Sequence, residues 1–393
     1  MLAAGILALS IWPSAQQPAD RTRGAAVQAP ASARASLPSR LTDQQFWSLS
    51  ERLSEPAGYF RSENLVSNEH TFQYIIPALQ QVSPGGVYLG VAPDQNFTYI
   101  AALRPPMAFI VDIRRGNLLQ HLMYKAIFEL SADRADFLSL LFCKKRPAGL
   151  GAAATVAQLF EAFDQVPTDR ELYAANLAAI RGHLLKRHGF KLSSEDLDGI
   201  ESIYFAFFWD GPGIRYSSGP TFGGRNAFGP VFPSYEELMM QTDWDGTPRS
   251  YLATDAQFRF VKGLEERNLI VPVVGNFAGP KALRAIGRYV REHGGRIGAF
   301  YVSNVEQYLF QDGLFEAFAR NVATLPVDST STFIRSVSIR YGYNGGMVGP
   351  DGRASALDPI RAFVADFQAG QVQGYIDVNA RSRASLAGDG AAH

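Results

Sequence analysis

The chain is predicted to fold as an α/β domain, a mostly parallel sheet flanked by helices with a large helical insertion after the second strand. Short apolar, β-prone runs bounded by Gly, Pro or Asn alternate along the 393 residues with segments of helical periodicity. A hydrophobic fraction of 47% allows a large core. The expected strands are 87–91, 107–111, 201–208, 269–274, 297–302 and 332–339. We expect one domain over residues 41–380, with the insertion at 113–200 and a disordered tail at 381–393.

The stretch from Gly86 to Asn117 has the outline of half a nucleotide-binding site. Its first apolar run predicts a buried parallel strand, and the helical pattern after it ends before Arg104-Pro105-Pro106. A second strand then ends in Asp112, about twenty residues beyond the glycine turn. In a Rossmann-like site, a carboxylate in this position accepts hydrogen bonds from ribose hydroxyls. Asp112 is therefore a predicted cofactor ligand.

The turn after the first strand reads Gly90-Val91-Ala92-Pro93-Asp94 and carries one glycine. The dinucleotide fingerprint has three glycines, so a pyrophosphate site is not expected here. A residue without a side chain still allows the backbone to come close to a ligand.

Helical patterns dominate the segment after Asp112. Asn117 and Ser131 are expected to cap its first two helices, and further helices are expected over 156–163 and 170–187. The resulting insertion of about 85 residues far exceeds an ordinary loop. We expect it to shape a substrate pocket or a lid.

The aromatic run Glu201 to Phe208 is predicted as the third strand. Asp210 follows it in a Gly/Pro turn, which would place a carboxylate at the crevice where open α/β sheets bind ligands. The aromatic side chains themselves are expected mainly in the core. The glycine-rich segment 211–233 is expected to be an ordered loop over this edge of the sheet.

A fourth strand is expected over 269–274, and Asn276 follows it. The sequence GNFAGPK lacks the spacing and the Ser or Thr of a P-loop, so Asn276 either faces a ligand or forms a turn. A fifth strand over 297–302, a late strand over 332–339 and a helix starting near Asp358-Pro359 complete the domain.

Charge and motifs exclude several classes of function. With 37 basic and 37 acidic residues the net charge is zero, which favours a small-molecule ligand over nucleic acid or an anionic membrane. GxSxG, HExxH, paired CxxC and EF-hand motifs are absent from the sequence. The histidines show no metal-ligand spacing, so no metal site is expected; those considered are His121, His183, His188 and His293. The lone cysteine, Cys143, is expected in the core.

The N-terminal segment bears on the compartment. Residues 1–12 are almost wholly apolar, too short to span a bilayer but similar in length to the apolar region of a signal peptide. Residues 13–40 have the composition of a disordered linker. The protein is expected to be exported or membrane-tethered if this segment is a signal, and cytoplasmic otherwise.

Three stretches carry a resemblance to a known family: 54–69, the segment from Gly86 through Phe137, and VGNFAG together with YVSNVEQYL. They resemble an uncharacterised bacterial protein family with the Rossmann-like fold of class I S-adenosylmethionine-dependent methyltransferases. In such folds a helix before the first strand leans over the cofactor, which draws attention to four polar residues: Asn64, Ser67, Asn68 and Glu69. The resemblance further implies S-adenosylmethionine as cofactor, bound by Gly90, Ala92, Asp94, Asn96, Asp112 and Ile113. It implies that the end of the fourth strand lies beside the reactive methyl, so that Asp210 or Asn276 orients the acceptor.

Three hypotheses about function follow. The first is an S-adenosylmethionine-dependent methyltransferase of unknown acceptor, for which alignment of the reactants suffices. The second is an exported, non-catalytic ligand-binding protein on the same scaffold, because this cofactor is a cytosolic metabolite. The third is a different transferase or hydrolase that uses Asp210 and Glu306, although no motif supports it.

Overall fold

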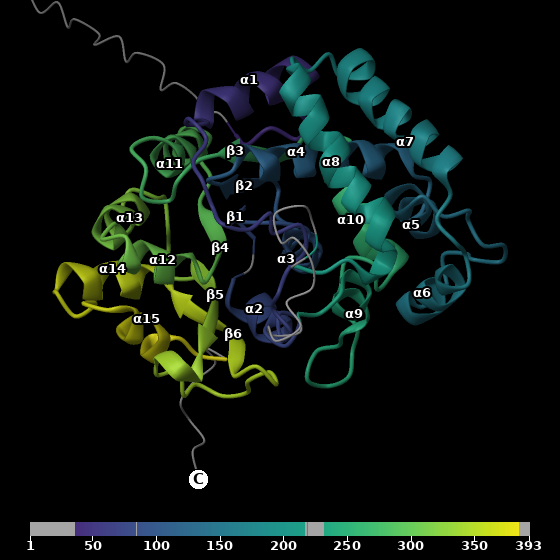
Figure 1. Ribbon diagram of the computed structural model, residues 1–393. Coiled ribbons are helices and arrows are strands. Elements are labelled where there is room, and N and C mark those ends of the chain that lie inside the picture. Colours follow the sequence, from purple (N-terminus) through teal and green to yellow (C-terminus); the bar gives the residue numbers. More distant parts are fainter. Residues whose placement is uncertain (1–35, 84, 217, 219–231, 385–393) are drawn as a thin grey trace, which may run out of the picture. The chain divides into compact units, whose positions relative to one another are not determined.

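A six-stranded sheet forms the centre of the fold (Figure 1). The computed structural model describes residues 36–83, 85–216, 218 and 232–384. The strand order is β3-β2-β1-β4-β5-β6, in which the first five strands are parallel and β6 runs antiparallel to β5. The strands are β1 (Val87–Gly90), β2 (Ala108–Asp112), β3 (Ile270–Val274), β4 (Ile297–Ser303), β5 (Thr332–Ser338) and β6 (Arg353–Pro359). The predicted α/β class with a mostly parallel, helix-flanked sheet is therefore confirmed.

The direction in which strands are added reverses at the pair β1 and β4. From β1 the chain adds β2 and β3 on one side, and then returns to place β4 on the other side of β1. Tyr88 of β1 pairs with Ala108 on one side and with Ala299 on the other. In open parallel sheets the loops at the carboxyl ends of such a strand pair diverge and leave a crevice.

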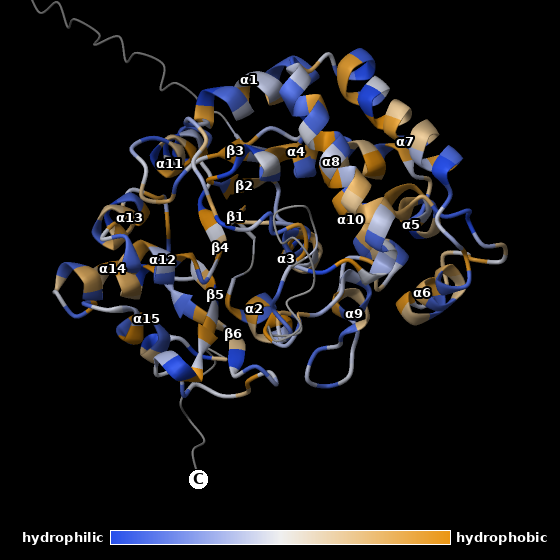
Figure 2. Ribbon diagram, in the orientation of Figure 1, coloured by the Kyte–Doolittle hydropathy of each residue, from blue (hydrophilic) through white to orange (hydrophobic). Residues whose placement is uncertain are grey.

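Two layers of helices cover the sheet (Figure 1). One layer contains α1 (Asp43–Leu53), α11 (Ala282–Glu292), α13 (Phe315–Val322) and α14 (Ile360–Gln368). The other contains α2 (Ile76–Val82), α3 (Gln95–Leu103), α4 (Arg115–Leu130) and α10 (Asp255–Glu265). The shorter α12 (Val305–Gln311) follows β4, and α15 (Tyr375–Arg381) packs against it. Figure 2 shows mostly hydrophobic residues along β1 and β2, as expected for strands buried on both faces.

Helix α4 connects the sheet to the helical insertion. Most of its residues are buried, including the polar side chains of His121 and Lys125. It contacts β2 and β3 and also the insertion helices α5 and α8. The insertion consists of α5 (Arg134–Phe142), α6 (Val156–Asp164), α7 (Arg170–Gly182), a π-helix (His183–Arg187), α8 (Ser194–Asp210) and α9 (Tyr235–Met240).

The third strand predicted over 201–208 is wrong, because these residues lie in helix α8. Ser193 accepts a hydrogen bond from the backbone of Asp196, whose side chain bonds back to the Ser193 N–H, a capping box that starts the helix. The buried residues Ile200, Ile203, Tyr204 and Phe207 then recur at helical spacing. The connection from β2 to β3, which contains the insertion, therefore runs from Ile113 to Leu269, and the strands predicted as fourth and fifth are β3 and β4.

Other boundaries also differ from expectation. The helix expected before the first strand begins only at Ile76, where Pro77 takes a first-turn position that needs no backbone N–H. Strand β6 was not predicted. The predicted disorder is wrong for the first residues of the tail, because Arg381 is helical and forms ion pairs, and Arg383 pairs with Leu357 through the backbone. Residues 385–393 lie outside the described part of the chain.

The predicted signal-like segment and most of the linker lie outside the described residues, as does most of the loop expected over 211–233. In the part of the chain that the structure describes, no helix combines the length and apolar character needed to cross a membrane.

Candidate functional site

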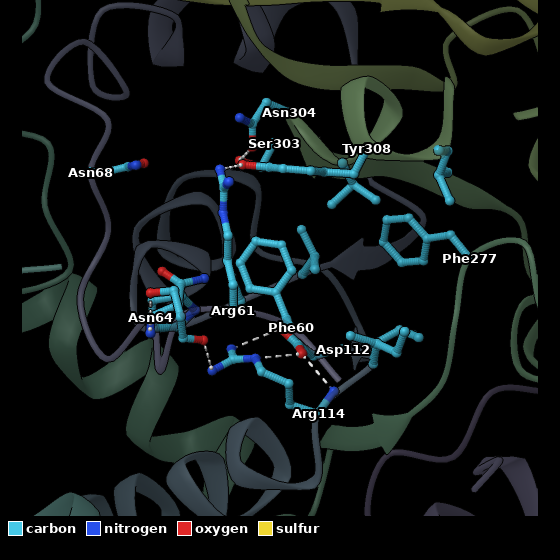
Figure 3. Close-up of a pocket in the computed structure, with 18 of the residues that line it drawn as sticks. Phe60, Arg61, Asn64, Asn68, Asp112, Arg114, Phe277, Ser303, Asn304 and Tyr308 are labelled. Carbon is cyan, nitrogen blue, oxygen red and sulfur yellow. Dashed lines mark hydrogen bonds and ion pairs between the residues drawn. The ribbon is translucent and has the colours of Figure 1, made fainter. Parts of the chain in front are cut away.

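A cavity of about 490 Å³ opens at the carboxyl ends of the parallel strands (Figure 3). Its walls come from the loops after β1, β2, β3 and β4, together with the segment that precedes α2. In Figure 3, Asp112 and Arg114 lie on one side of the cavity, and Ser303, Asn304 and Tyr308 lie on the opposite side. The cavity therefore occupies the crevice at which the strand order reverses.

The loop after β1 is held from beneath by Asn96. The Asn96 Nδ2 group donates to the carbonyl oxygens of Val91, Ala92 and Pro93 at 2.8, 3.1 and 2.7 Å. The hydroxyl of Tyr88 donates to Asn96 Oδ1 at 2.9 Å. All four hydrogen bonds of this buried amide are thus internal, and Asn96 supports the loop without being among the described residues that line the cavity.

The side-chain amide of Asn96 also explains why position 90 is a glycine. A Cβ at Gly90 would lie 1.9 Å from Asn96 Oδ1, a separation that no side chain tolerates. Ala92 lines the cavity and adopts a left-handed backbone conformation with a φ of 67°, which is costly for a residue other than glycine. The loop therefore has one shape, set by Asn96, and presents Ala92 to the cavity while Gly90 faces inward.

Asp94 is the residue directly before helix α3, at its N-cap position, and is 1% exposed. Neither of its carboxyl oxygens has a hydrogen-bond partner among the described residues. Burial raises the pKa of this carboxyl to about 7. Asp94 lies outside the set of described residues that line the cavity, so the structure separates it from the predicted ligands Ala92, Asp112 and Ile113.

Asp112 ends β2 and lines the cavity together with Ile113. Its Oδ1 and Oδ2 atoms accept hydrogen bonds from Nε and Nη2 of Arg114, each at 3.1 Å, and Oδ1 also accepts from the Arg114 backbone N–H at 2.8 Å. The Nη1 group of Arg114 donates to the backbone carbonyls of Ser62 and Glu63. Arg114 thereby fastens the segment before α2 to the end of β2.

A second carboxylate, that of Glu69, lines the cavity on the side of β4 and is 3% exposed. Its Oε1 atom accepts hydrogen bonds from the hydroxyls of Tyr301 and Ser303 at 2.8 and 2.6 Å, and its Oε2 atom accepts from Gln95 Nε2 at 3.0 Å. Burial, followed by the charge of Glu69, raises the pKa of Tyr301 well above its usual value, so its hydroxyl remains a donor. Glu69 thus joins β4, α3 and the segment before α2.

The four polar residues that the resemblance singled out before the first strand all line the cavity: Asn64, Ser67, Asn68 and Glu69. Ser67 donates to the side chain of Gln95, which connects it to Glu69.

An aromatic wall completes the cavity beside β4. The rings of Phe60 and Tyr308 meet edge to face with centroids 5.2 Å apart. Arg61 Nη2 donates to the Tyr308 hydroxyl at 3.3 Å (Figure 3). Phe277, from the loop after β3, supplies a further apolar surface. A flat apolar ring system could therefore lie against this wall.

Asn276 lines the cavity, but its side chain has a local task as well. Its Oδ1 atom accepts a hydrogen bond from the backbone N–H of Ala278 at 2.9 Å, the arrangement of an Asx turn. Both interpretations proposed from the sequence, a turn former and a cavity residue, therefore describe it. It follows β3, however, whereas β4 ends in Ser303 and is followed by Asn304.

Asp210 is the last residue of α8, is exposed, and is absent from the described lining of the cavity. Its predicted position at the carboxyl end of a strand is wrong, because that strand is a helix. Glu306 is 1% exposed and accepts from Nε and Nη2 of Arg335 at 2.5 and 3.0 Å, so it serves a buried ion pair.

Of the predicted site residues, the structure brings together Ala92, Asp112, Ile113 and Asn276 at the cavity, and leaves Gly90, Asp94, Asn96 and Asp210 out of its described lining. The cavity residues that sequence reasoning did not assign include Arg61, Arg114, Tyr301, Ser303, Asn304 and Tyr308. Ser303 and Asn304 could have been found, because they follow a predicted strand. Because α8 was counted as the third strand, β3 was numbered as the fourth strand, and the acceptor site was predicted in the loop after β3 and not at the end of β4.

No curated protein matches this chain. A family model described as a domain of unknown function, DUF7790, matches residues 64–195 and 222–356. These ranges cover more than half of the chain and include the ends of β1, β2, β3 and β4 around the cavity. The chain therefore belongs to the DUF7790 family.

Proposed function

We propose that this protein is an S-adenosylmethionine-dependent methyltransferase. The observation that carries the proposal is the position of the cavity, at the crevice between β1 and β4, with Asp112 at the end of the neighbouring β2. The strand order β3-β2-β1-β4-β5-β6 has the connectivity of a doubly wound nucleotide-binding sheet, except that its last strand is antiparallel. The sequence resemblance to methyltransferase-like proteins points to the same use of the crevice.

In this proposal Asp112 accepts a hydrogen bond from a ribose hydroxyl. Arg114 already donates three hydrogen bonds to the carboxylate, which has about four lone-pair positions, so one acceptor position is left for the ligand. The adenine ring lies against the aromatic wall formed by Phe60 and Tyr308. A cavity of about 490 Å³ is of the size that holds such a ligand.

The acceptor would approach from the end of β4. Methyl transfer forms a bond from the acceptor atom to the methyl carbon and breaks the bond from that carbon to sulfur, so alignment of the two reactants supplies most of the catalysis. Ser303 and Asn304 offer hydrogen-bonding groups at this end of the cavity. Glu69 lies beside them and would take up the proton that an oxygen or nitrogen acceptor releases.

A second candidate, a non-catalytic binding protein on the same scaffold, is favoured by the loop after β1. Asn96 fills the space beneath this loop, and the left-handed conformation at Ala92 falls on a residue that carries a side chain. These features fix the loop without the glycines that allow a backbone to approach a phosphate or a sulfonium cofactor closely.

Isothermal titration of the purified protein with S-adenosylmethionine and S-adenosylhomocysteine tests the proposal. We expect one-to-one binding in the micromolar range and at least a tenfold loss of affinity in Asp112→Ala, because the ribose would lose its charged acceptor. Asp198→Ala, which removes an exposed aspartate from α8, is the matched control and should bind like the wild type.

Absence of binding to a chain that unfolds cooperatively would overturn the methyltransferase proposal and favour the binding protein. Binding that Asp112→Ala leaves unchanged would place the cofactor elsewhere and would also contradict it.

A further inference from the structure

Three side chains from distant parts of the sequence meet beside helix α4. Glu129 lies near the end of α4, His183 begins the π-helix, and His188 follows it directly. Glu129 Oε2 lies 2.6 Å from His183 Nε2 and 2.7 Å from His188 Nε2. One ligand atom from each residue lies within 4.8 Å of the others, so the three could share one metal ion.

The π-helix explains why the two histidines face the same point. In an α-helix the residues that share a face are three or four positions apart, and His183 and His188 are five apart. The backbone N–H of His188 donates to the carbonyl of His183 at 3.0 Å, the i to i+5 hydrogen bond of a π-helix, which places such residues one above the other. The spacing therefore concealed a cluster that the sequence analysis did not expect.

The hydrogen bonds of His188 need an additional positive charge. Its Nδ1 atom lies 2.7 Å from Asp43 Oδ1, and its Nε2 atom lies 2.7 Å from Glu129 Oε2. A neutral imidazole has one N–H and can donate to only one of these carboxylates. The other contact requires either a further proton, on the ring or on the carboxyl group, or a cation between Nε2 and Glu129.

The surrounding residues match the outer shell of a transition-metal site. In such sites a carboxylate commonly accepts the second N–H of a ligating histidine, as Asp43 does for His188. Asp43 is itself held by Asn268 Nδ2 at 2.9 Å, and the His188 ring stacks on Phe190 with centroids 4.8 Å apart. Lys125 Nζ binds the other oxygen of Glu129 at 2.6 Å, which leaves Oε2 for the ion.

We infer that Glu129, His183 and His188 form a binding site for Zn²⁺ or a similar transition-metal ion, with water in the fourth position. Two imidazoles and one carboxylate are a donor set that Zn²⁺ accepts, with bonds of about 2.0–2.2 Å. Tetrahedral bonds of this length place the ligand atoms ~3.3 Å apart, so Glu129 Oε2 and each of the two imidazoles separate by ~0.6 Å when the ion replaces the protons between them. The His183 side chain, 16% exposed, leaves a path for the ion and its water.

The site is separate from the cavity. Glu129 lies fourteen residues along α4 from Arg115, a distance of roughly 21 Å along the helix axis. The ion would join α4, the end of α7 and, through Asp43, helix α1, and so would fix the insertion to the sheet domain. The proposed ion site does not depend on the proposed methyl transfer.

Metal titration of the full chain without a histidine tag tests the inference. After removal of metals with EDTA, we expect one Zn²⁺ per chain by elemental analysis, a rise in the melting temperature with Zn²⁺ but not with Mg²⁺, and visible Co²⁺ absorption typical of tetrahedral coordination. His183→Ala should abolish these effects, and Asp43→Asn should weaken Zn²⁺ binding about 10–100-fold. His293→Ala, at the end of α11, is the matched control and should bind normally.

His183→Ala is the leading variant because its partly exposed side chain can be removed with little effect on packing, which near-ultraviolet circular dichroism checks. A folded wild type that binds no Zn²⁺ at one-to-one stoichiometry, or binding that persists in His183→Ala, would overturn the inference. The cluster would then be an ion-paired network around a doubly protonated His188. Either result leaves the cofactor titration unaffected.

Discussion

Asp112 and Arg114, two residues apart, form a bidentate ion pair on one side of the cavity. Each of the two side-chain hydrogen bonds is 3.1 Å long, and the Arg114 side chain is 11% exposed. The residue expected to bind the ribose is therefore also the partner of a nearly buried guanidinium.

We predict that Asp112→Ala lowers the free energy of unfolding by about 2 kcal/mol, because it leaves the Arg114 guanidinium without its charged partner. Arg114→Ala should cost a similar amount. The double variant should cost at least about 1 kcal/mol less than the sum of the two, since the interaction is lost only once. Urea unfolding of the four proteins measures this coupling.

Additive effects of the two substitutions would contradict the coupling. These four unfolding measurements also serve as a control for the cofactor titration. They show whether the loss of S-adenosylmethionine binding in Asp112→Ala is larger than its loss of stability explains.

Gly90→Ala is predicted to destabilise the protein by about 2–4 kcal/mol, the range of overpacking and strain in a core. The new methyl group would displace the Asn96 amide and with it the three loop carbonyls that this amide binds. Thermal or urea unfolding measures the loss. The control is Gly263→Ala in α10, where a Cβ meets no atom within 4 Å; it should be neutral or stabilising by about 0.5–1 kcal/mol. Equal effects of the two substitutions would show that Asn96 does not occupy this position.

Asp94 should make the protein less stable as the pH rises. Burial raises the pKa of its carboxyl to about 7, above the ordinary value of 3.8, so the folded state holds the proton more tightly than the unfolded chain. Between about pH 4 and pH 7 the folded state binds more protons, and the free energy of unfolding falls with increasing pH. Above pH 7 this loss is complete.

Asp94→Asn keeps the shape and removes the titration. Relative to the wild type, the variant should gain up to about 3 kcal/mol in the free energy of unfolding at pH 8 compared with pH 5. Burial also raises the pKa of Glu265 to about 8, but this group is present in both proteins and cancels in the comparison. Urea unfolding at the two pH values measures the difference. If the free energy of unfolding changed with pH in the same way in both proteins, the prediction that Asp94 is a buried carboxyl with a raised pKa would be contradicted.

The main strands of the parallel sheet could be predicted because their sequences fit one structure only. The runs that form β1, β2, β3 and β4 are short, apolar and bounded by turn residues, which excludes a long helix. The same local information placed Asp112 at the end of β2, because the strand is followed at once by polar residues.

The error at 201–208 arose because an aromatic run satisfies two periodicities. Tyr204, Phe207 and Phe208 are buried in α8, while Phe205 and Trp209 are exposed, and this choice is made by packing against α4, α5 and α7. An isolated pattern of this kind does not distinguish a buried strand from a helix.

The sequence by itself determined the fold class, the position of the glycine turn and the acid that ends the second strand, because each depends on neighbours within a few residues. Only the tertiary structure decided which residues share the cavity and which side chains cluster around His188. Glu69 reaches Tyr301 of β4, and Glu129 reaches His183, across 232 and 54 positions of the chain. Contacts at such separations are made by the packing of whole elements, which no local pattern records.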